Sequence, residues 1–307
     1  MTRTTEHYAG VAWCPSTRNQ TIFVRHDGTT FWSGNSHAGK TQLINSAICN
    51  NRDRRILFFS MDDPAEMILI KLTCMQQGVD AETLERHIRD DEQDGRKALR
   101  RAATSDFSKL IVVDESMGLG ALTKAVEEAT DYWGAPPECV FIDYLQSLEG
   151  NGSSDDEDGG VRQKIQGIKR WVKNKPFPTV VVHQNTRSKG GPGARITMTS
   201  GAYGGEQQST MLIGVRRKRD DEDLDQWERD QNENTVTLHI VKNKRPPCKV
   251  TPIDGVDFFM SPTTGAIRLL RDEDLSAGAT SAANKIHKTA EGAMSALADG
   301  VVRNGTD

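Results

Sequence analysis

Eight consecutive residues near the start of the chain have the composition of a phosphate-binding loop. Two glycines are separated by four residues, and a lysine and a threonine follow the second glycine. The segment consists of Gly34, Asn35, Ser36, His37, Ala38, Gly39, Lys40 and Thr41. The glycines let successive backbone N–H groups turn toward a polyphosphate, the lysine adds a positive charge, and the threonine hydroxyl is a ligand for Mg²⁺. The pattern predicts that the chain binds a nucleoside triphosphate together with Mg²⁺.

An acidic residue at the end of an apolar run supplies the second half of this chemistry. Asp143 comes directly after residues 139–142, which have the apolar composition of a buried strand. A P-loop enzyme requires an acid at the end of a neighbouring strand to hold the water shell of its Mg²⁺. We therefore expect Thr41 and Asp143 to lie together at the metal, with Lys40 on the phosphates.

Alternating strand and helix patterns predict how these residues are positioned. A hairpin of strands at 21–25 and 29–32 should lead into the loop, and a helix should follow it. Further strands are expected at 55–60, 110–114, 139–143 and 179–182, with helices at 65–77, 119–132 and around 165–172, and two short surface helices within 80–108. This alternation predicts an α/β fold with a mostly parallel central sheet and helices on both faces.

The pattern changes beyond residue 210. Strands at 211–215, 236–241, 249–253 and 266–269 are joined by turns, which indicates an antiparallel C-terminal extension. The segments 150–160 and 220–233 are strongly polar, the second with eight acidic residues, and both are expected to be loops. The basic run at 216–219 is expected to be the solvated base of a hairpin.

Composition indicates an ordinary soluble protein without membrane association. The 307 residues carry a formal net charge of −4, with 36% hydrophobic and 27% charged residues, which argues against a wholly basic nucleic-acid binder. No apolar run approaches the ~18 residues that span a bilayer. The five cysteines lack the spacing of a metal site, which favours reduced core thiols in a cytoplasmic protein.

Six segments, in order, resemble the DnaB-type hexameric replicative helicases, over roughly residues 20 to 270. Besides the P-loop they are FFSMDDPAEMILIKL, IVVDESMGLGAL, IDYLQ, VVVHQNTRS, SGAYGGEQQS and IVKNKRPP. The resemblance implies a RecA-like ATPase and helicase motor domain at 21–272. It would be preceded by an N-terminal arm at 1–20 and followed by a flexible or weakly helical tail at 273–307. Without the family's N-terminal collar domain, the chain resembles compact phage- or plasmid-encoded relatives, which act in the cytoplasm of a bacterial host.

The resemblance also assigns roles around the nucleotide, which it identifies as ATP. Asp62 stands where the family has the glutamate that activates the attacking water. Because aspartate is one methylene shorter, Asp63 and Glu66 stay open as substitutes. Gln184 matches the glutamine that senses the γ-phosphate.

Two cations late in the chain match groups that reach the nucleotide of the next subunit in the family. Lys242 matches the family's lysine. The arginine finger falls on Lys244, but we favour Arg245, one residue along, because a planar guanidinium grips phosphate oxygens with two hydrogen bonds.

The loop from Ser188 to Gln208 is the expected DNA-facing surface. It combines two cations with glycines and hydroxyl groups that let backbone N–H groups approach phosphates; the candidates are Lys189, Arg195, Ser200 and Gly201.

The expected function is therefore an ATP-driven helicase that moves along single-stranded DNA as a ring, most simply a homohexamer, during DNA replication, with a primase or a loader as partner. Two alternatives remain open at this point. One is a RecA- or KaiC-like DNA-dependent ATPase that does not unwind DNA. The other is a DNA-binding loader or scaffold that uses ATP only as an assembly switch.

Overall fold

The computed structural model divides the chain into two units, residues 1–37 and 38–307. In the first unit it describes the backbone of 22–26 and 29–33. In the second it describes 38–90, 92–145, 148, 157–183, 209–246, 248–252, 254–271 and 274, with side chains in the helix that starts at 157 only from residue 163. In the first unit β1 (Ile22–His26) pairs antiparallel with β2 (Thr29–Ser33). The hairpin predicted before the P-loop is thus confirmed, with its first strand shifted by one residue.

A four-stranded parallel sheet forms the centre of the second unit. Its order is β4 (Leu110–Val113), β3 (Ile56–Ser60), β5 (Cys139–Asp143) and β6 (Thr179–Val181). The register places Ser60 opposite Asp143, so the carboxyl ends of β3 and β5 coincide. Each crossover contains a helix, which is how parallel neighbours are usually joined. The predicted α/β architecture is confirmed.

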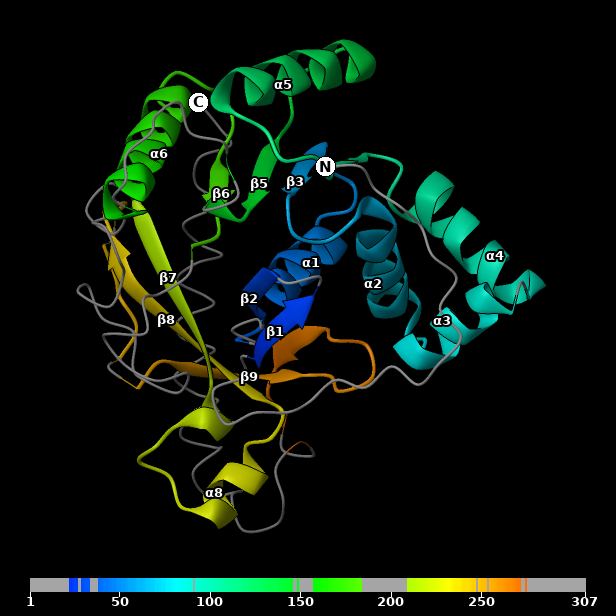
Figure 1. Cartoon of the computed structure of the whole chain (residues 1–307), viewed down its shortest axis with the longest axis vertical. Helices are drawn as coiled ribbons and strands as arrows, with labels where there is room; N and C mark the ends of the chain where they lie inside the picture. The colour runs from blue at the N-terminus through cyan, green and yellow to red at the C-terminus, as the bar shows by residue number, and fades with distance from the viewer. Residues whose placement is uncertain are drawn as a thin grey trace. The chain divides into compact units, whose positions relative to one another are not determined.

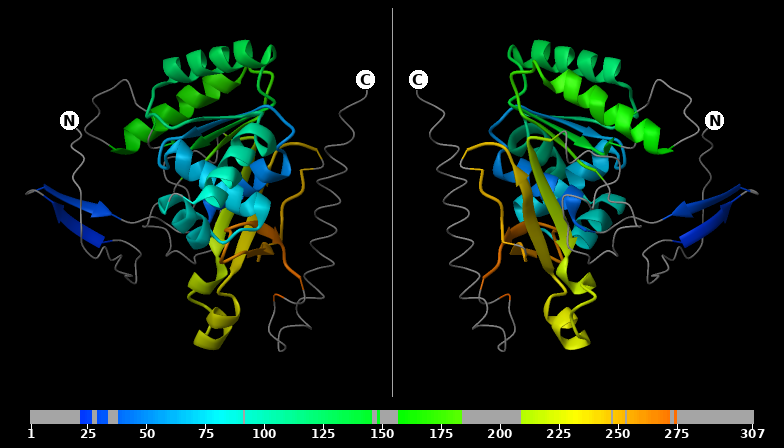
Figure 2. Two further views of the ribbon diagram at one scale, coloured as in Figure 1. Left: turned by 90° about the vertical axis from the view of Figure 1, so that its right-hand side faces the viewer. Right: turned by 90° about the vertical axis from the view of Figure 1, so that its left-hand side faces the viewer.

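Helices cover both faces of this sheet. On one face lie α1 (Lys40–Asn50) and α2 (Ala65–Gln77), and on the other lie α5 (Leu119–Trp133) and α6 (Glu157–Val172), as Figure 2 shows. Side chains of β3 point alternately toward the two helix layers, and all five of its residues are buried.

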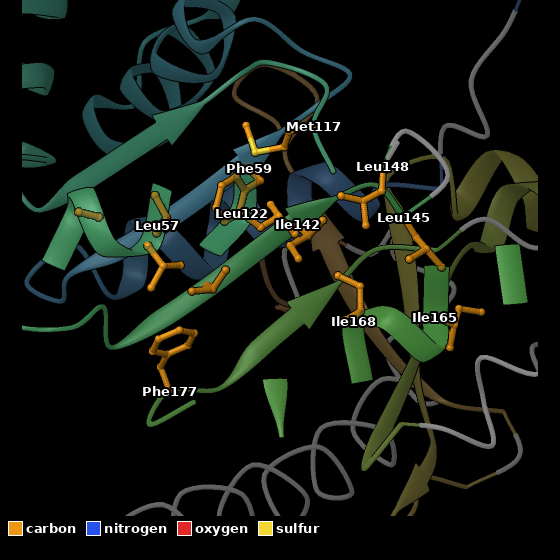
Figure 3. Packing of buried hydrophobic residues seen from close by; sticks show 13 residues of the cluster. Leu57, Phe59, Met117, Leu122, Ile142, Leu145, Leu148, Ile165, Ile168 and Phe177 are labelled. Carbon is orange, nitrogen blue, oxygen red and sulfur yellow. The ribbon is translucent and has the colours of Figure 1, made fainter. Parts of the chain in front are cut away.

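The two faces of β3 contribute to two separate hydrophobic cores. Ile56 and Phe58 pack toward α1 and α2, whereas Leu57 and Phe59 pack toward α5 and α6 (Figure 3). Burying side chains of this size stabilises the fold by about 1.5–3 kcal/mol each. A central strand that is buried on both faces holds its carboxyl end in a fixed place, and that end carries the turn discussed below.

The two short helices predicted within 80–108 are confirmed as α3 (Ala81–Arg89) and α4 (Gln93–Arg101), followed by the π-helical turn η1 (Ala102–Asp106). Leu84 of α3 is buried against α2. The polar segment predicted as a loop at 150–160 is partly helical, because α6 already begins at Glu157. Acidic residues in the first turn of a helix are favourable there.

The C-terminal strands form an antiparallel sheet in the order β10, β9, β8, β7 (Figure 1), with β7 at Met211–Arg217, β8 at Thr235–Asn243, β9 at Val256–Met260 and β10 at Ile267–Leu269. The extension is confirmed, but the strand predicted at 249–253 is wrong: residues 248–252 are not in a strand. Thr251 still contacts β8 through Ile240: its hydroxyl accepts the N–H of Ile240 at 3.1 Å, and its own N–H donates to the carbonyl of Ile240 at 3.3 Å. Pro252 has no N–H to donate to a ladder.

The acidic insert is structured rather than a simple loop. It contains the 3₁₀ turn η4 (Lys218–Asp220) and α8 (Gln226–Gln231), whose start carries a capping box formed by Asp225 and Glu228. The basic run before it is not solvated either. Arg216 is 4% exposed and pairs with Asp221 at 2.6 Å. A buried guanidinium requires such a partner, because removing its charge from water is otherwise costly.

In the described residues, no helix combines the length and apolar character needed to cross a membrane.

Candidate active site

The start of α1 has the geometry of a phosphate-binding helix terminus. Gly39 caps the helix in a left-handed conformation with φ of 90°, which a glycine adopts without steric cost. Its carbonyl accepts the N–H of Leu43 at 2.9 Å, and Lys40 is the first helical residue. The unpaired N–H groups and the dipole of a helix N-terminus attract anions. Of the predicted loop, residues 34–37 lie outside the described residues.

The structure brings Thr41 and Asp143 together, although they are 102 residues apart in the sequence. The Thr41 hydroxyl donates a hydrogen bond to Oδ2 of Asp143 at 2.7 Å. Asp143 ends β5 and is 5% exposed. A hydroxyl and a carboxylate are hard oxygen ligands of the kind that Mg²⁺ takes, and Mg²⁺ completes its shell with waters and substrate phosphates. The pair therefore fits a magnesium ion without further protein ligands.

Burial perturbs the charged groups of this site. The pKa of Lys40 is lowered by burial and partly restored by the neighbouring Asp143. The pKa of Asp143 is raised, first by burial and then by the negative charges of Asp62 and Asp63, against the hydrogen bond from Thr41 and the charge of Lys40. Perturbed groups that converge in this way are typical of functional sites. In the protein without ligand, the site carries more carboxylate charge than Lys40 balances.

The turn between β3 and α2 carries the three acids that the sequence left open for water activation. Asp62 is exposed, and it is the first of the neighbouring acids that raise the pKa of Asp143. Asp63 is half-buried and forms an ion pair with Lys71 of α2 at 2.6 Å. Glu66 is exposed in the first turn of α2. The structure thus places Asp62 and Asp63 near Asp143 but in different surroundings.

The antiparallel sheet packs against the start of α1. A Cβ atom built on Gly39 would lie 3.5 Å from Sδ of Met260, 3.8 Å from Val236 and 3.9 Å from Ile267. The N–H of Ile267 also donates to Oγ of Ser46 in α1 at 2.9 Å. Apolar side chains of the antiparallel sheet therefore pack against Gly39 and help to fix the phosphate-binding turn.

Sequence reasoning missed Arg217, which lies beside this contact. The residue is 4% exposed, its guanidinium contacts Sδ of Met260 at 3.4 Å, and burial lowers its pKa. Among the described residues, its Nε has no hydrogen-bond partner. The alternation along β7 places Arg217 on one face, but the sequence does not indicate which face is buried.

The two late cations do not join this cluster within one chain. β8 begins beside the phosphate-binding turn, where Val236 approaches Gly39, and runs away from it. Lys242 lies six residues further along the strand, which is roughly 20 Å at 3.3 Å per residue. Lys242 is half-buried, and Lys244 and Arg245 beyond it are exposed. Gln184 and the loop candidates Lys189, Arg195, Ser200 and Gly201 lie outside the described residues.

The sequence matches one described family. Residues 27–254 match the DnaB-like helicase C terminal domain. Among curated proteins, the chain is 24% identical over 152 residues to the replicative DNA helicase DnaB of Rickettsia bellii (strain RML369-C). That match covers 50% of this chain but only 30% of the helicase. The chain therefore spans less than a third of this relative.

Two solved structures are similar to the fold. One is a DnaB-like replicative helicase, solved in a study of its interactions with primase; it matches with a TM-score of 0.62 and 16% identity, over 76% of this chain and 55% of that chain. The other is an isolated ATPase domain with the same TM-score and identity, matched over 82% of its length. At this identity the likeness concerns the fold, and it confirms the RecA-like arrangement of parallel sheet, flanking helices and antiparallel extension.

Proposed function

The chain belongs to the family of DnaB-like helicase C-terminal domains, and on that premise we propose that it is an ATP-driven DNA helicase motor. It moves along single-stranded DNA as a ring, in the service of DNA replication, and it works inside a bacterial cell. Residues 21–272 form the motor, with an arm before it and a tail after it. The reaction is hydrolysis of ATP with Mg²⁺.

One observation carries this proposal. The Thr41 hydroxyl donates a hydrogen bond to the carboxylate of Asp143, and Thr41 lies in the first turn of α1, which begins at Lys40. In P-loop enzymes catalysis consists of positioning and of charge stabilisation around the phosphates. Here Lys40 would balance phosphate charge, and Thr41 and Asp143 would hold a Mg²⁺ ion that neutralises charge developing on the phosphate oxygens. The residues 34–39 supply backbone N–H groups.

Asp62 is the residue that we assign to water activation, with Gln184 as the sensor of the γ-phosphate. Asp62 is exposed at the carboxyl end of β3, next to Asp143, so a water between it and a bound phosphate is geometrically reasonable. A positioned carboxylate accelerates such a step by about 10²–10⁴-fold.

Lys242 and Arg245 act in trans in this proposal. Because they lie roughly 20 Å or more along β8 from the phosphate-binding turn, neither side chain reaches the nucleotide of its own chain. A neighbouring subunit in a ring would receive them instead. The loop candidates Lys189, Arg195, Ser200 and Gly201 face the DNA, and a primase or a loader is the expected protein partner.

A coupled assay tests the function. We expect ATP hydrolysis that rises on addition of single-stranded DNA, together with displacement of one strand from a forked duplex. Lys40→Ala should abolish nucleotide binding, whereas Asp143→Asn should retain much of the binding and lose Mg²⁺-dependent turnover. Undiminished hydrolysis in both variants would contradict the assignment of this site.

The same assay separates the two alternatives. DNA-stimulated hydrolysis without strand displacement would identify a RecA- or KaiC-like ATPase that does not unwind DNA. ATP-dependent assembly on DNA with no stimulated turnover would identify a loader or scaffold.

A further inference from the structure

The turn that carries Asp62 is held at several points by contacts that the P-loop motif does not include. Ser60, at the end of β3, donates its hydroxyl to the carbonyl of Asp63 at 2.7 Å and is 2% exposed. The N–H of Met61 donates to the carbonyl of Asp143 at 2.8 Å. The first bond closes the turn on itself, and the second ties the beginning of the turn to Asp143 at the end of β5.

Two side-chain contacts hold the far end of the turn. Oδ2 of Asp114, just after β4, accepts the N–H of Ala65 at 2.8 Å and so satisfies one of the free N–H groups at the start of α2. Nζ of Lys71, in the middle of α2, lies 2.6 Å from Oδ2 of Asp63. Both partners of this ion pair are about 70% buried, at 27% and 29% side-chain exposure, so solvent screens the pair less than it would screen a surface pair.

Asp63 is therefore occupied on both its backbone and its side chain. Its carbonyl accepts the hydroxyl of Ser60 and one carboxylate oxygen contacts the Lys71 ammonium, and the adjacent Asp62 is exposed. The second aspartate adds a negative charge to a site that already holds Asp62 and Asp143, and the Lys71 ammonium compensates for it.

We propose that Lys71 and Asp63 form a positioning pair that fixes the Ser60–Pro64 turn, so that Asp62 is the base and Asp63 is its anchor. This inference rests on the proposed ATP hydrolysis and assigns a role to two residues outside the P-loop motif. Lys71 neutralises Asp63 and holds the turn. Loss of Lys71 leaves the carboxylate of Asp63 without its ammonium partner, beside the acids Asp62 and Asp143, and removes one contact that holds the turn.

The test combines four variants with steady-state ATPase kinetics. Lys71→Met keeps the unbranched shape of the side chain and removes its charge. It should lower kcat by about tenfold, because small misplacements of a catalytic group are costly, while KM for ATP changes by less than about twofold. Lys71→Arg should retain activity. Asp63→Asn, whose amide oxygen can still accept a hydrogen bond from Lys71, should keep at least about a third of the wild-type kcat. Adding Asp63→Asn to Lys71→Met should lower kcat no further than Lys71→Met alone, because the pair is already broken.

Two results would overturn the inference while leaving the proposed function intact. One is an Asp63→Asn protein as inactive as Asp62→Asn, and the other is a Lys71→Met protein with unchanged kcat. If the wild type shows no Lys40-dependent hydrolysis, the proposed function fails, and urea unfolding of the same variants then decides whether the pair exists. Losses of stability that do not add in the double variant support the pair, whereas additive losses refute it.

Discussion

The proposal that neighbouring subunits share each active site makes a quantitative prediction about mixtures of two inactive variants. Arg245→Ala removes the cation delivered to the neighbour, and Lys40→Ala removes the receiving P-loop. Within one chain the two sites are too far apart to cooperate, because Lys242 already lies roughly 20 Å along β8 from the contact between Val236 and Gly39, and a lysine or arginine side chain extends only about 6–7 Å. Each variant alone should therefore be inactive, with a loss of at least ~10³ in kcat expected for a missing arginine finger.

Mixing restores a calculable fraction of the sites. In a ring of randomly mixed subunits at equal amounts, an interface works only if the receiving subunit has Lys40 and the donating subunit has Arg245. About one interface in four meets both conditions, since head-to-tail contacts pair the two faces independently. The expected rate is therefore about a quarter of the wild-type rate per subunit if interfaces act independently, and less if hydrolysis proceeds around the ring in sequence.

The measurement is ATP hydrolysis with single-stranded DNA, at protein concentrations above and below ring assembly, with mixed rings verified by differently tagged subunits. Wild-type activity per subunit should rise steeply with concentration. A mixture that stays inactive although mixed rings form would refute the shared site. Full activity in dilute monomer would refute it as well.

Three further predictions follow from the described geometry and the sequence. Burial raises the folded-state pKa of Asp143; the stability that this gives is present at low pH and is lost as pH rises through that pKa. Asp143→Asn should thus stabilise the ligand-free protein near pH 7 in urea unfolding while Mg²⁺-dependent turnover falls, and a less stable variant would contradict this. Gly255→Ala should destabilise the protein by more than about 3 kcal/mol and Gly134→Ala by about 1–2 kcal/mol, because both have positive φ but only at Gly255 would a Cβ lie within 2.8 Å of buried side chains; equal losses in thermal unfolding would refute the steric argument. Replacing Lys189 and Arg195 by Ala should reduce the log–log salt slope of single-strand binding by up to ~1.4, at about 0.7 per lost phosphate contact, without altering hydrolysis in the absence of DNA; an unchanged slope would place the DNA path elsewhere.

Local sequence patterns determined the elements and the identity of the phosphate-binding segment. The two glycines with Lys40 and Thr41 predict a loop and a helix start because only a few residue types tolerate those backbone and charge requirements. The helix Ala65–Gln77 and the strand Cys139–Asp143 were predicted with the bounds that the structure has. Apolar periodicity is a property of neighbouring residues, so it can be read without a fold.

Local sequence patterns gave wrong predictions where contacts with residues distant in the sequence determine the structure. The run at 216–219 has the composition of a solvated turn, yet Arg216 is buried because Asp221 and His239 provide partners for its guanidinium. The strand predicted at 249–253 does not form: β8 pairs with Val256–Met260, and Thr251 bonds to Ile240 through one backbone and one side-chain hydrogen bond.

Only the tertiary structure distinguished the surroundings of the three acids beside Asp143. From the sequence, Asp62 is the acid that the resemblance favours, and Asp63 and Glu66 stay open as substitutes. The fold places Lys71 against Asp63 and Ser60 against its carbonyl, while the parallel register of β3 and β5 brings Asp62 beside Asp143. Ion pairing and burial depend on residues that meet only when strands and helices pack, so the difference between adjacent aspartates arises at that stage.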